Sequence, residues 1–442
     1  MSLDFKIIIN LLSFLLFLIP IALITGPFLP DFFLVIFSII FLVTIIYRKE
    51  FNYLNNKFTY LFLLFYLYLL FNSLISNNIL LSLESSLFYF RFGIFSLGIW
   101  YVLENNENFL KQFFFLLLFI FLIVSIDAYI QFFTGYNIMG FEKDEVRVSG
   151  FFNSELKLGS YLVRLYPIFF GISYILSKSN NLYIYIAFLL FIFVDVLIYL
   201  TGERTAFFLL FLHFLIIIFL LQGLRKLRII SFIFSLIIIT ILSFYFPSSK
   251  NRMVNDTLNQ LNLDNVFTNI NPITQETKKE IEVDDGHVDF WKDIKLNQKR
   301  ILAFSPHHEL TYGLALKIFK DNIIFGIGPK MFREYCNYDK YYIQYGCTSH
   351  PHNTYIQLLV ETGLIGFAFV FSIFLFICYI YFKQLLSFFF KINRINDNII
   401  LFLAPIFITL WPIVPSGNFF NNWLSIIYFL PIGFVIFFYK KD

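Results

Sequence analysis

Separate apolar runs of about 18 or more residues recur along the whole chain, and they limit its fold more than any other feature. A run of this length crosses a bilayer as a helix, because a helix pairs every backbone N–H and C=O group within the segment. The composition agrees, with 59% hydrophobic and 14% charged residues among 442. We therefore expect an all-α polytopic membrane protein. Its expected spans, about twelve, lie near residues 7–25, 29–47, 58–75, 85–103, 111–133, 158–177, 182–200, 205–222, 229–246, 354–382, 398–415 and 420–439.

The Lys and Arg residues between spans give the chain an orientation. Short cytoplasmic connections retain positive charge, and the connections after the first, third and eleventh spans carry no Lys or Arg. The positive connections hold Arg48, Lys49 and Lys57; Arg225, Lys226 and Arg228; Lys383, Lys391 and Arg394; and Lys440 and Lys441. All of them fall on one side of the membrane if both termini are cytoplasmic, which is the topology that we expect.

With this topology, polar segments face the far side at about 134–157, at the turn from Thr201 to Arg204, and in the long loop from Pro247 to His352. The first apolar run lacks a small-residue cleavage site and leads into another span, so we expect it to remain as an anchor. The expected domains are 1–246, a bundle of about nine spans; 247–352, an extracytoplasmic loop or cap; and 353–442, a bundle of about three spans.

Two of the three cysteines, Cys336 and Cys347, lie in the long loop, whereas Cys378 lies within a span. In an oxidising compartment the first two either form a disulfide or remain as unpaired thiols. A metal site is not expected there, because no compact Cys/His spacing accompanies them.

His352 stands where the long loop gives way to the span near 354–382. A proton-accepting imidazole at a helix start meets unpaired backbone N–H groups and the positive end of the helix dipole, both of which favour bound phosphate. This placement suggests catalysis on a phosphate-bearing substrate at the membrane surface.

Asn353, Gln357 and Glu361 recur at intervals of four, so they form one stripe on the same helix. Such a stripe in an apolar helix faces either a wet cavity, where it would bind substrate, or a partner helix to which it hydrogen-bonds. The sequence leaves both open. Gly363 and Gly366 further along favour close helix packing, which is a structural role.

Arginines near the outer ends of spans need a reason, because a charge there is costly unless it is paired or functional. Arg204 either has a structural role, in which it snorkels to the membrane surface or pairs with the adjacent Glu203, or forks onto phosphate oxygens. Arg147 lies on the same side, where alone it would be an ordinary loop residue. Arg164 and Arg91 lie inside spans, where each either faces the cavity or forms a structural ion pair, and both rank below Arg147 and Arg204.

Two further segments raise the question of a metal site. His307, His308 and Glu309 are adjacent and cannot easily converge on one ion, and no other ligand is spaced to complete a site. The segment from Val283 to Asp289 is similar to a loose divalent-ion or sugar-nucleotide motif, but its charge and turn composition favour a solvated loop. We expect neither a metal nor a cofactor.

The segment that begins at His352 also resembles a known signature. His352-Asn353, nine residues and then Gly363-Leu364-Ile365-Gly366 is similar to the pattern of the bacterial O-antigen ligase and O-antigen polymerase superfamily. That pattern is a histidine, a small polar residue, nine positions and Gly-x-x-Gly. Other blocks are weak singly, but their order, with the large loop before the His-Asn motif, is specific. They are Asp127 to Gln131 with Gly135, Arg147 to Gly159, Gly202 to Ala206, Leu316 to Phe332, and Pro415 to Asn422.

The resemblance implies a metal-independent, inverting glycosyltransferase in the bacterial inner membrane, with its active site facing the periplasm. The family moves a glycan from undecaprenyl diphosphate to an acceptor hydroxyl, and for a ligase the acceptor is lipid A–core. By resemblance, Arg204 holds the diphosphate and His352 is the essential histidine. An imidazole that titrates near neutrality suits the acceptor hydroxyl, and Arg147 adds positive charge for the leaving group. Membrane lipid is an expected partner, and nucleic acid is not.

One position departs from the family pattern, which often has an arginine four residues before an aromatic that opens the helix in the loop. Here the aromatic is Tyr312, and His308 takes the arginine's place. Either His308 replaces it as a phosphate contact, or Arg300 or Arg333 does.

Two other functions remain open. A polymerase would join lipid-linked repeat units and shares the signature, although the compact His-Asn match leans towards the ligase. A transporter of polyisoprenyl-linked saccharide would use the same cationic cavity, but the two halves of the chain show no internal repeat, which transporters commonly have.

Overall fold

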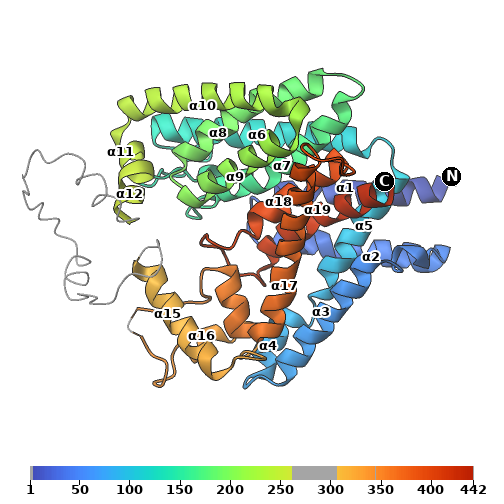
Figure 1. The fold of residues 1–442 in the computed structure, drawn as a ribbon, viewed down its shortest axis with the longest axis vertical. Coiled ribbons are helices and arrows are strands. Elements are labelled where there is room, and N and C mark those ends of the chain that lie inside the picture. The colour runs from blue at the N-terminus through green and yellow to red at the C-terminus, as the bar shows by residue number, and fades with distance from the viewer. Residues whose placement is uncertain (1–2, 261–305, 344, 442) are drawn as a thin grey trace, which may run out of the picture.

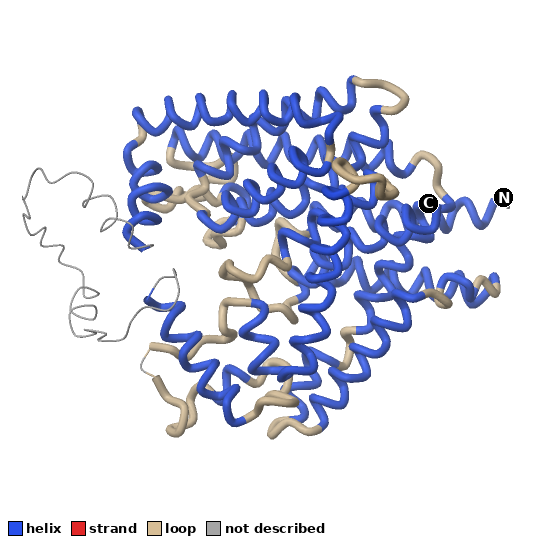
Figure 2. Tube along the Cα trace, in the orientation of Figure 1, coloured by secondary structure: helices blue, strands red, loops and turns tan. Residues whose placement is uncertain are grey.

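The computed structural model describes residues 3–260, 306–343 and 345–441, and within them helices are joined by loops (Figure 2). The segment from Val283 to Asp289 and Arg300 lie outside the described residues. The longer helices are α1 (Leu3–Ala22), α2 (Phe28–Arg48), α3 (Lys57–Leu74), α4 (Ile79–Ser86), α5 (Phe90–Asn105), α6 (Phe109–Thr134), α7 (Leu158–Ser177), α8 (Leu182–Leu200), α9 (Arg204–Leu220), α10 (Arg225–Tyr245), α15 (Pro306–Asp321), α17 (Thr354–Leu386), α18 (Asp397–Thr409) and α19 (Asn422–Lys441). Shorter ones are α11 (Pro247–Lys250), the π-helical turn η4 (Asn251–Asn255), α12 (Asp256–Gln260) and α16 (Phe332–Tyr335).

The expected fold class is confirmed, since 10 helical segments within the described part of the chain are long and apolar enough to cross a membrane. The chain is therefore an integral membrane protein. The expected spans near 205–222 and 398–415 correspond to shorter apolar helices, α9 and α18. The second expectation was too long: α18 ends at Thr409, and the chain turns back where Pro412 and Pro415 cannot donate helical hydrogen bonds.

Most helices pack into a large apolar core, in which α5 lies against α19, and α7 lies against α8 and α18. A second, smaller apolar cluster joins α15, α16 and the first part of α17. Figure 1 shows both termini at one end of this bundle and α11, α12 and α15 at the other. We call these ends the terminal face and the loop face. The termini therefore share a side, as the charge pattern predicts.

Helix α17 is broken at Gly363, whereas the sequence predicts one continuous span. Gly363 has φ +63° and ψ −167°, which separates residues 354–362 from the rest of the helix. The segment from Ile323 to Gly328 pairs with the break: Ile327 N–H donates to Val360 O at 3.0 Å, and Leu364 N–H donates to Ile323 O at 2.9 Å. A Cβ at Gly363 would lie 2.2 Å from the carbonyl oxygen of Ile324, so this approach needs glycine.

Helix α3 also contacts the residues at this break. The hydroxyl of Tyr68 donates to Thr362 O, and the side-chain amide of Asn72 donates to Phe325 O. Gly366 also lies against Tyr68, whose ring carbon would be 3.2 Å from an added Cβ. The expected packing role of Gly366 is thus confirmed, at the contact between α17 and α3.

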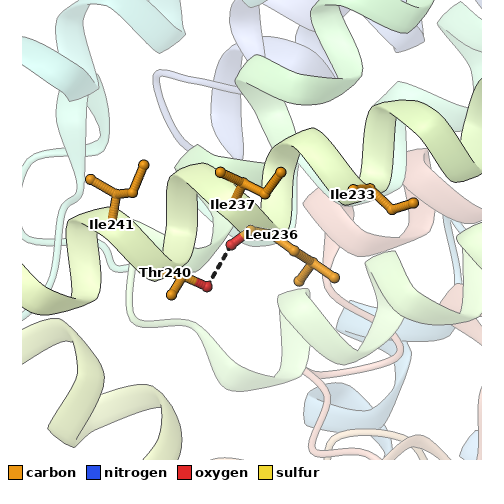
Figure 3. Close-up of a pocket in the computed structure, with 5 residues that line it drawn as sticks. All are labelled: Ile233, Leu236, Ile237, Thr240 and Ile241. Carbon is orange, nitrogen blue, oxygen red and sulfur yellow. Dashed lines mark hydrogen bonds between the residues drawn. The ribbon is translucent and has the colours of Figure 1, made fainter.

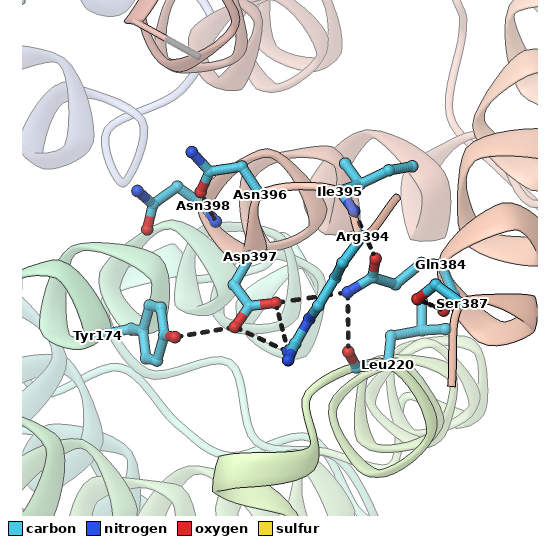
Figure 4. Close-up of polar contacts among 9 residues, drawn as sticks. All are labelled: Tyr174, Leu220, Gln384, Ser387, Arg394, Ile395, Asn396, Asp397 and Asn398. Carbon is cyan, nitrogen blue, oxygen red and sulfur yellow. Dashed lines mark hydrogen bonds and ion pairs between the residues drawn. The ribbon is translucent and has the colours of Figure 1, made fainter. Parts of the chain in front are cut away.

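At the terminal face, a polar clamp ties four helices together around Asp397 (Figure 4). Its carboxylate accepts hydrogen bonds from Tyr174 at 2.9 Å and from Arg394 at 2.8 and 3.1 Å. Gln384 joins the clamp by donating to Asp397 and to Leu220 O, both at 3.4 Å. The inner ends of α7, α9, α17 and α18 are therefore fixed to one another.

Arg228, which the sequence places among the cytoplasmic surface charges, is instead buried. Its guanidinium pairs with Asp195 on α8 at 2.7 Å, and both side chains are 0% exposed. Ser235 also donates to Asp195, and the guanidinium lies 3.8 Å above the ring of Phe191. The expectation was wrong because charge counting cannot detect a carboxylate on a neighbouring helix.

A groove on α10 contains only side chains of that helix: Ile233, Leu236, Ile237, Thr240 and Ile241 (Figure 3). Thr240 satisfies its hydroxyl by donating to Leu236 O within the helix. The exposed apolar faces of Ile233, Ile237 and Ile241 suit contact with lipid tails.

The structure joins Cys336 and Cys347 in a disulfide, with 5.1 Å between their Cα atoms. This resolves the choice that the sequence left open. Cys378 remains a free thiol on α17.

Candidate active site

His352 lies in the tight turn that leads into α17. Its backbone has φ +54°, in the left-handed region that costs energy for any residue except glycine. The carbonyl oxygen of His352 accepts a hydrogen bond from Ser416 N–H at 2.8 Å and another from the hydroxyl of Tyr312 at 3.4 Å. The strained turn is therefore fixed from two sides, and the position of the imidazole is fixed with it.

Two other imidazoles surround His352. The ring of His350 lies 4.2 Å from that of His352, and the ring of His308 lies 5.6 Å away, in each case between centroids. Burial and the neighbouring His352 lower the pKa of His350 to about 3, so His350 is neutral at physiological pH. Its Nε2 atom is buried without a hydrogen-bond partner. His308 thus stands beside the predicted catalytic histidine, at the place of the family arginine.

The start of α17 does not offer free N–H groups, contrary to the expectation from sequence. The side chain of Asn353 accepts hydrogen bonds from Tyr355 N–H at 3.0 Å and from Ile356 N–H at 3.1 Å, which caps the helix. An anion at this site must therefore be held mainly by side chains.

The stripe on α17 is turned into the protein. Asn353 donates to the carbonyl oxygens of Pro412 and Val414. Gln357 donates to Glu361 and to Asn418, each at 2.8 Å. Asn353, Gln357 and Glu361 are all buried, so their hydrogen bonds hold residues 410–421 against the first part of α17.

Three arginines form a positive cluster at the loop face, which we call the arginine cluster: Arg147, Arg204 and Arg252. The charges of Arg252 and Arg147 both act on Arg204. Each guanidinium has one buried nitrogen without a hydrogen-bond partner: Nε of Arg147, one terminal nitrogen of Arg204 and Nε of Arg252. Burial lowers the pKa of Arg147, and the charge of Arg252 adds to the shift, whereas Glu203 opposes it. Like charges held together with unused donors form a site suited to a polyanion.

Arg204 does not pair with Glu203, which was one of its two interpretations. The carboxylate of Glu203 instead accepts hydrogen bonds from Gly159 N–H at 2.7 Å and from Ser160 N–H at 3.0 Å. Glu203 thereby caps α7 from the start of α9. Among the described residues, Arg204 has no ion pair, and its charge remains available.

The two arginines within spans differ from each other. Arg91 pairs with Asp31 at 2.8 Å and donates to Asn422, so it is a structural ion-pair member. Arg164 is 4% exposed and donates to Ser160 O, but its Nε atom has no partner. Glu203 and Tyr428 lie close enough to Arg164 to interact electrostatically with its guanidinium.

The segment 410–421 lies between the arginine cluster and His352. Phe208, one turn after Arg204, contacts the ring of Trp411 at 6.2 Å between centroids. The next residue, Pro412, accepts the hydrogen bond from Asn353, which adjoins His352. Segment 410–421 therefore connects the first turns of α9, which begins at Arg204, with the start of α17, which follows His352.

Sequence reasoning missed two residues of the site: Arg252, and His350, whose ring lies beside that of His352. Arg252 follows an apolar span within a polar stretch, where an arginine is ordinarily a surface residue. Its proximity to Arg204 depends on the π-helical turn after α10, which the pattern does not predict. Arg333, named above as a possible replacement cation, acts electrostatically on His350 and has an unpartnered Nε atom.

No group of three or more His, Cys, Asp or Glu side chains within the described segments is arranged to hold a metal ion. Comparison with curated proteins finds no match. A family model described as O-Antigen ligase matches residues 186–371, from within α8 to the part of α17 that follows the Gly363 break. The matched region contains Arg204, the disulfide and the His-Asn signature, and on this evidence residues 186–371 are similar to the O-antigen ligase family, which supports the resemblance to the O-antigen ligase and polymerase superfamily.

Proposed function

We propose that this protein is an inverting glycosyltransferase of the O-antigen ligase type. It transfers a glycan from undecaprenyl diphosphate to a sugar hydroxyl of lipid A–core. The observation that carries the proposal is the placement of a fixed imidazole, His352, on the same face as the arginine cluster, whose members have unused donors.

In the proposed reaction, the acceptor oxygen attacks the anomeric carbon of the donor sugar. The bond from that carbon to the phosphate oxygen breaks, and the diphosphate leaves with the electron pair. His352 takes the proton from the acceptor hydroxyl, which is general-base catalysis. Arg204, Arg147 and Arg252 stabilise the charge that develops on the diphosphate. No step uses a metal or a cofactor.

The remaining residues have supporting roles in this proposal. His308 contacts the phosphate or the acceptor from beside His352. Arg164, with its unpartnered Nε atom, adds positive charge below the arginine cluster. Asn353, Gln357 and Glu361 position the substrate site by holding residues 410–421 in place.

The proposed topology places the loop face in the periplasm of a bacterial inner membrane and the terminal face in the cytoplasm. The positive connections and both termini then share the cytoplasmic side. The disulfide between Cys336 and Cys347 supports this orientation, because disulfides persist in oxidising compartments such as the periplasm.

A transfer assay with purified protein, lipid-linked donor and two acceptors tests the proposal. We expect product on lipid A–core, and no product with His352→Ala at normal expression and membrane insertion. Arg204→Gln should weaken transfer by roughly 10- to 100-fold, since a charge-assisted contact contributes about 1.5–3 kcal/mol. Arg225→Ala, which removes a cation at the terminal face, is the matched control.

The same assay distinguishes the ligase from the two alternatives. Elongation of a second lipid-linked repeat unit would indicate a polymerase. Movement of lipid-linked sugar across vesicles without a new glycosidic bond would indicate a transporter. In cells, gene loss distinguishes the first two: ligase loss leaves long chains on the carrier lipid, whereas polymerase loss leaves single repeats on the core.

A further inference from the structure

Tyrosines are concentrated in the loop that the disulfide closes. We call residues 335–347 the tyrosine loop, because it contains Tyr335, Tyr338, Tyr341, Tyr342 and Tyr345. The proposed mechanism uses imidazoles and arginines and assigns no role to these tyrosines.

Two of the tyrosines anchor the loop. Tyr335 and Tyr341 are 8% and 5% exposed, and their rings lie 6.2 Å apart in a stacked arrangement. The hydroxyl of Tyr341 donates to Asp321 at the end of α15 at 2.9 Å, and Lys340 pairs with the same carboxylate at 2.7 Å. Together with the disulfide, these contacts hold the described residues of the loop against α15.

The other three rings are exposed, and one of them, Tyr338, also packs against the ring of Tyr335 at 4.8 Å between centroids. Tyr338, Tyr342 and Tyr345 are 42%, 58% and 55% exposed. Tyr342 N–H donates to Tyr338 O at 3.0 Å, so one helical turn places these two side chains on the same side. Between residues 326 and 363, the exposed large hydrophobic side chains of the described residues are these three tyrosines alone.

The tyrosine loop is connected to His352 through α15. An added Cβ at Gly346 would lie 3.2 Å from Leu310 O, so the loop backbone packs directly on that helix. Two residues after Leu310 on the same helix, the hydroxyl of Tyr312 donates to the carbonyl oxygen of His352. Arg252 of the arginine cluster lies between α11 and α12, and Figure 1 shows these two helices on one part of the loop face and α15 and α16 on the opposite part. The loop therefore lies on the side of His352 away from the proposed diphosphate site.

We propose that the exposed rings of Tyr338, Tyr342 and Tyr345 bind the sugar chain of the acceptor. A tyrosine ring has a negative face that attracts the C–H groups of a pyranose, and its hydroxyl exchanges hydrogen bonds with sugar hydroxyls. The rings are rigid, so little conformational entropy is lost on binding. This inference rests on the proposed function, because it assigns the acceptor to one side of that site.

Tyrosines are also common at membrane interfaces. Here the exposed rings alternate with the exposed charged residues Asp339 and Lys340, and the exposed apolar side chains of α10 are by contrast mostly Ile, Leu and Phe. This mixture of rings and charges suits a hydrated sugar chain better than lipid, and contact with lipid is an outcome of the test.

The test uses the full chain in nanodiscs and three variants. Tyr338→Ala/Tyr342→Ala should raise the KM for the acceptor roughly tenfold, because two ring contacts with the sugar are lost, with kcat and donor KM unchanged. Tyr338→Phe/Tyr342→Phe should retain most of the affinity. Asp339→Ala, an exposed residue of the same loop, should match the wild type. An unchanged acceptor KM in the double alanine variant would overturn the proposal.

A binding measurement separates this inference from the proposed function. Core oligosaccharide, released by mild acid from the host's own lipid A–core, should bind the wild type and His352→Ala equally in saturation-transfer NMR. It should not bind the double alanine variant. If the wild type binds the oligosaccharide but transfers no glycan, the proposed function is rejected, whereas the proposed sugar-binding role of the tyrosine loop is supported. Quenching of Tyr342→Trp fluorescence by brominated lipid, and not by aqueous iodide, would assign the loop to the membrane instead.

Discussion

Glu203 and Ser160 join the starts of two helices: the hydroxyl of Ser160 on α7 donates to the Glu203 carboxylate, just before α9, at 2.8 Å. The backbone N–H of Ser160 donates to the same oxygen at 3.0 Å. Burial raises the pKa of Glu203, and these hydrogen bonds oppose that shift. Arg164 and Arg204, one on each helix, are thereby held in a fixed relation.

Glu203→Ala should destabilise the protein by about 1–3 kcal/mol, because it leaves the buried donors of Gly159 and Ser160 without an acceptor. It should also raise the KM for the lipid-linked donor, since the arginine cluster loses its support. The thermal unfolding midpoint in detergent and donor titration measure the two effects. Glu155→Ala, on the neighbouring surface, is the control, and equal behaviour of the two variants would contradict the capping role.

Gly363→Ala should prevent normal folding, whereas Gly313→Ala should not. The first adds a Cβ 2.2 Å from Ile324 O at a φ of +63°, and the second meets nothing within 4 Å. In a helix interior such as α15, the change to alanine should stabilise by about 0.5–1 kcal/mol. Yield of monodisperse protein and its unfolding midpoint test the pair. A well-folded Gly363→Ala variant would show that the break does not depend on glycine.

His350 should make stability depend on pH. Its pKa is about 3 in the folded protein and near 6.5 when unfolded, so below pH 6.5 the unfolded chain binds the proton more readily. The stabilising effect of neutral His350 is therefore present above pH 6.5 and is lost as the pH falls towards 3. His350→Gln should flatten the fall of the unfolding midpoint between pH 7.5 and 5. Ser349→Ala keeps the titrating ring and should preserve the slope, so an equal slope in all three proteins would contradict this assignment.

Asp195→Ala should cost about 3–5 kcal/mol, because it leaves the Arg228 guanidinium charged and buried without its partner. Asp195→Leu/Arg228→Met should recover most of that loss, since apolar replacement of a buried pair is often neutral. Unfolding midpoints of the single and double variants measure the difference. A double variant no more stable than the single one would indicate that the pair has a further role.

The membrane-spanning architecture could be predicted because an apolar run long enough to cross a bilayer is a local property of the sequence. The break at Gly363 and the early end of α18 could not. The first depends on the distant segment from Ile323 to Gly328, and the second on segment 410–421 packing against α17. Hydropathy adds side-chain preferences over a window and does not register such backbone contacts.

The candidate site likewise has a part that could be predicted from the sequence and a part that could not. Arg204 and His352 were predicted from the resemblance, and their common face follows from the alternation of spans. The contact of Asn353 with Pro412, the role of Glu203 towards α7 and the place of Arg252 each depend on a partner remote in sequence. A single sequence does not show which polar side chains, distant along the chain, will contact one another in the folded protein.

The break in α17 has a consequence for how the protein tolerates its surroundings. Bilayers differ in thickness, and a spanning helix responds by changing its tilt. Because the nine-residue piece that follows the histidine turn is tied to residues 323–328 by its own backbone hydrogen bonds, its orientation is set by those contacts and not by the tilt of the lipid-crossing piece alone.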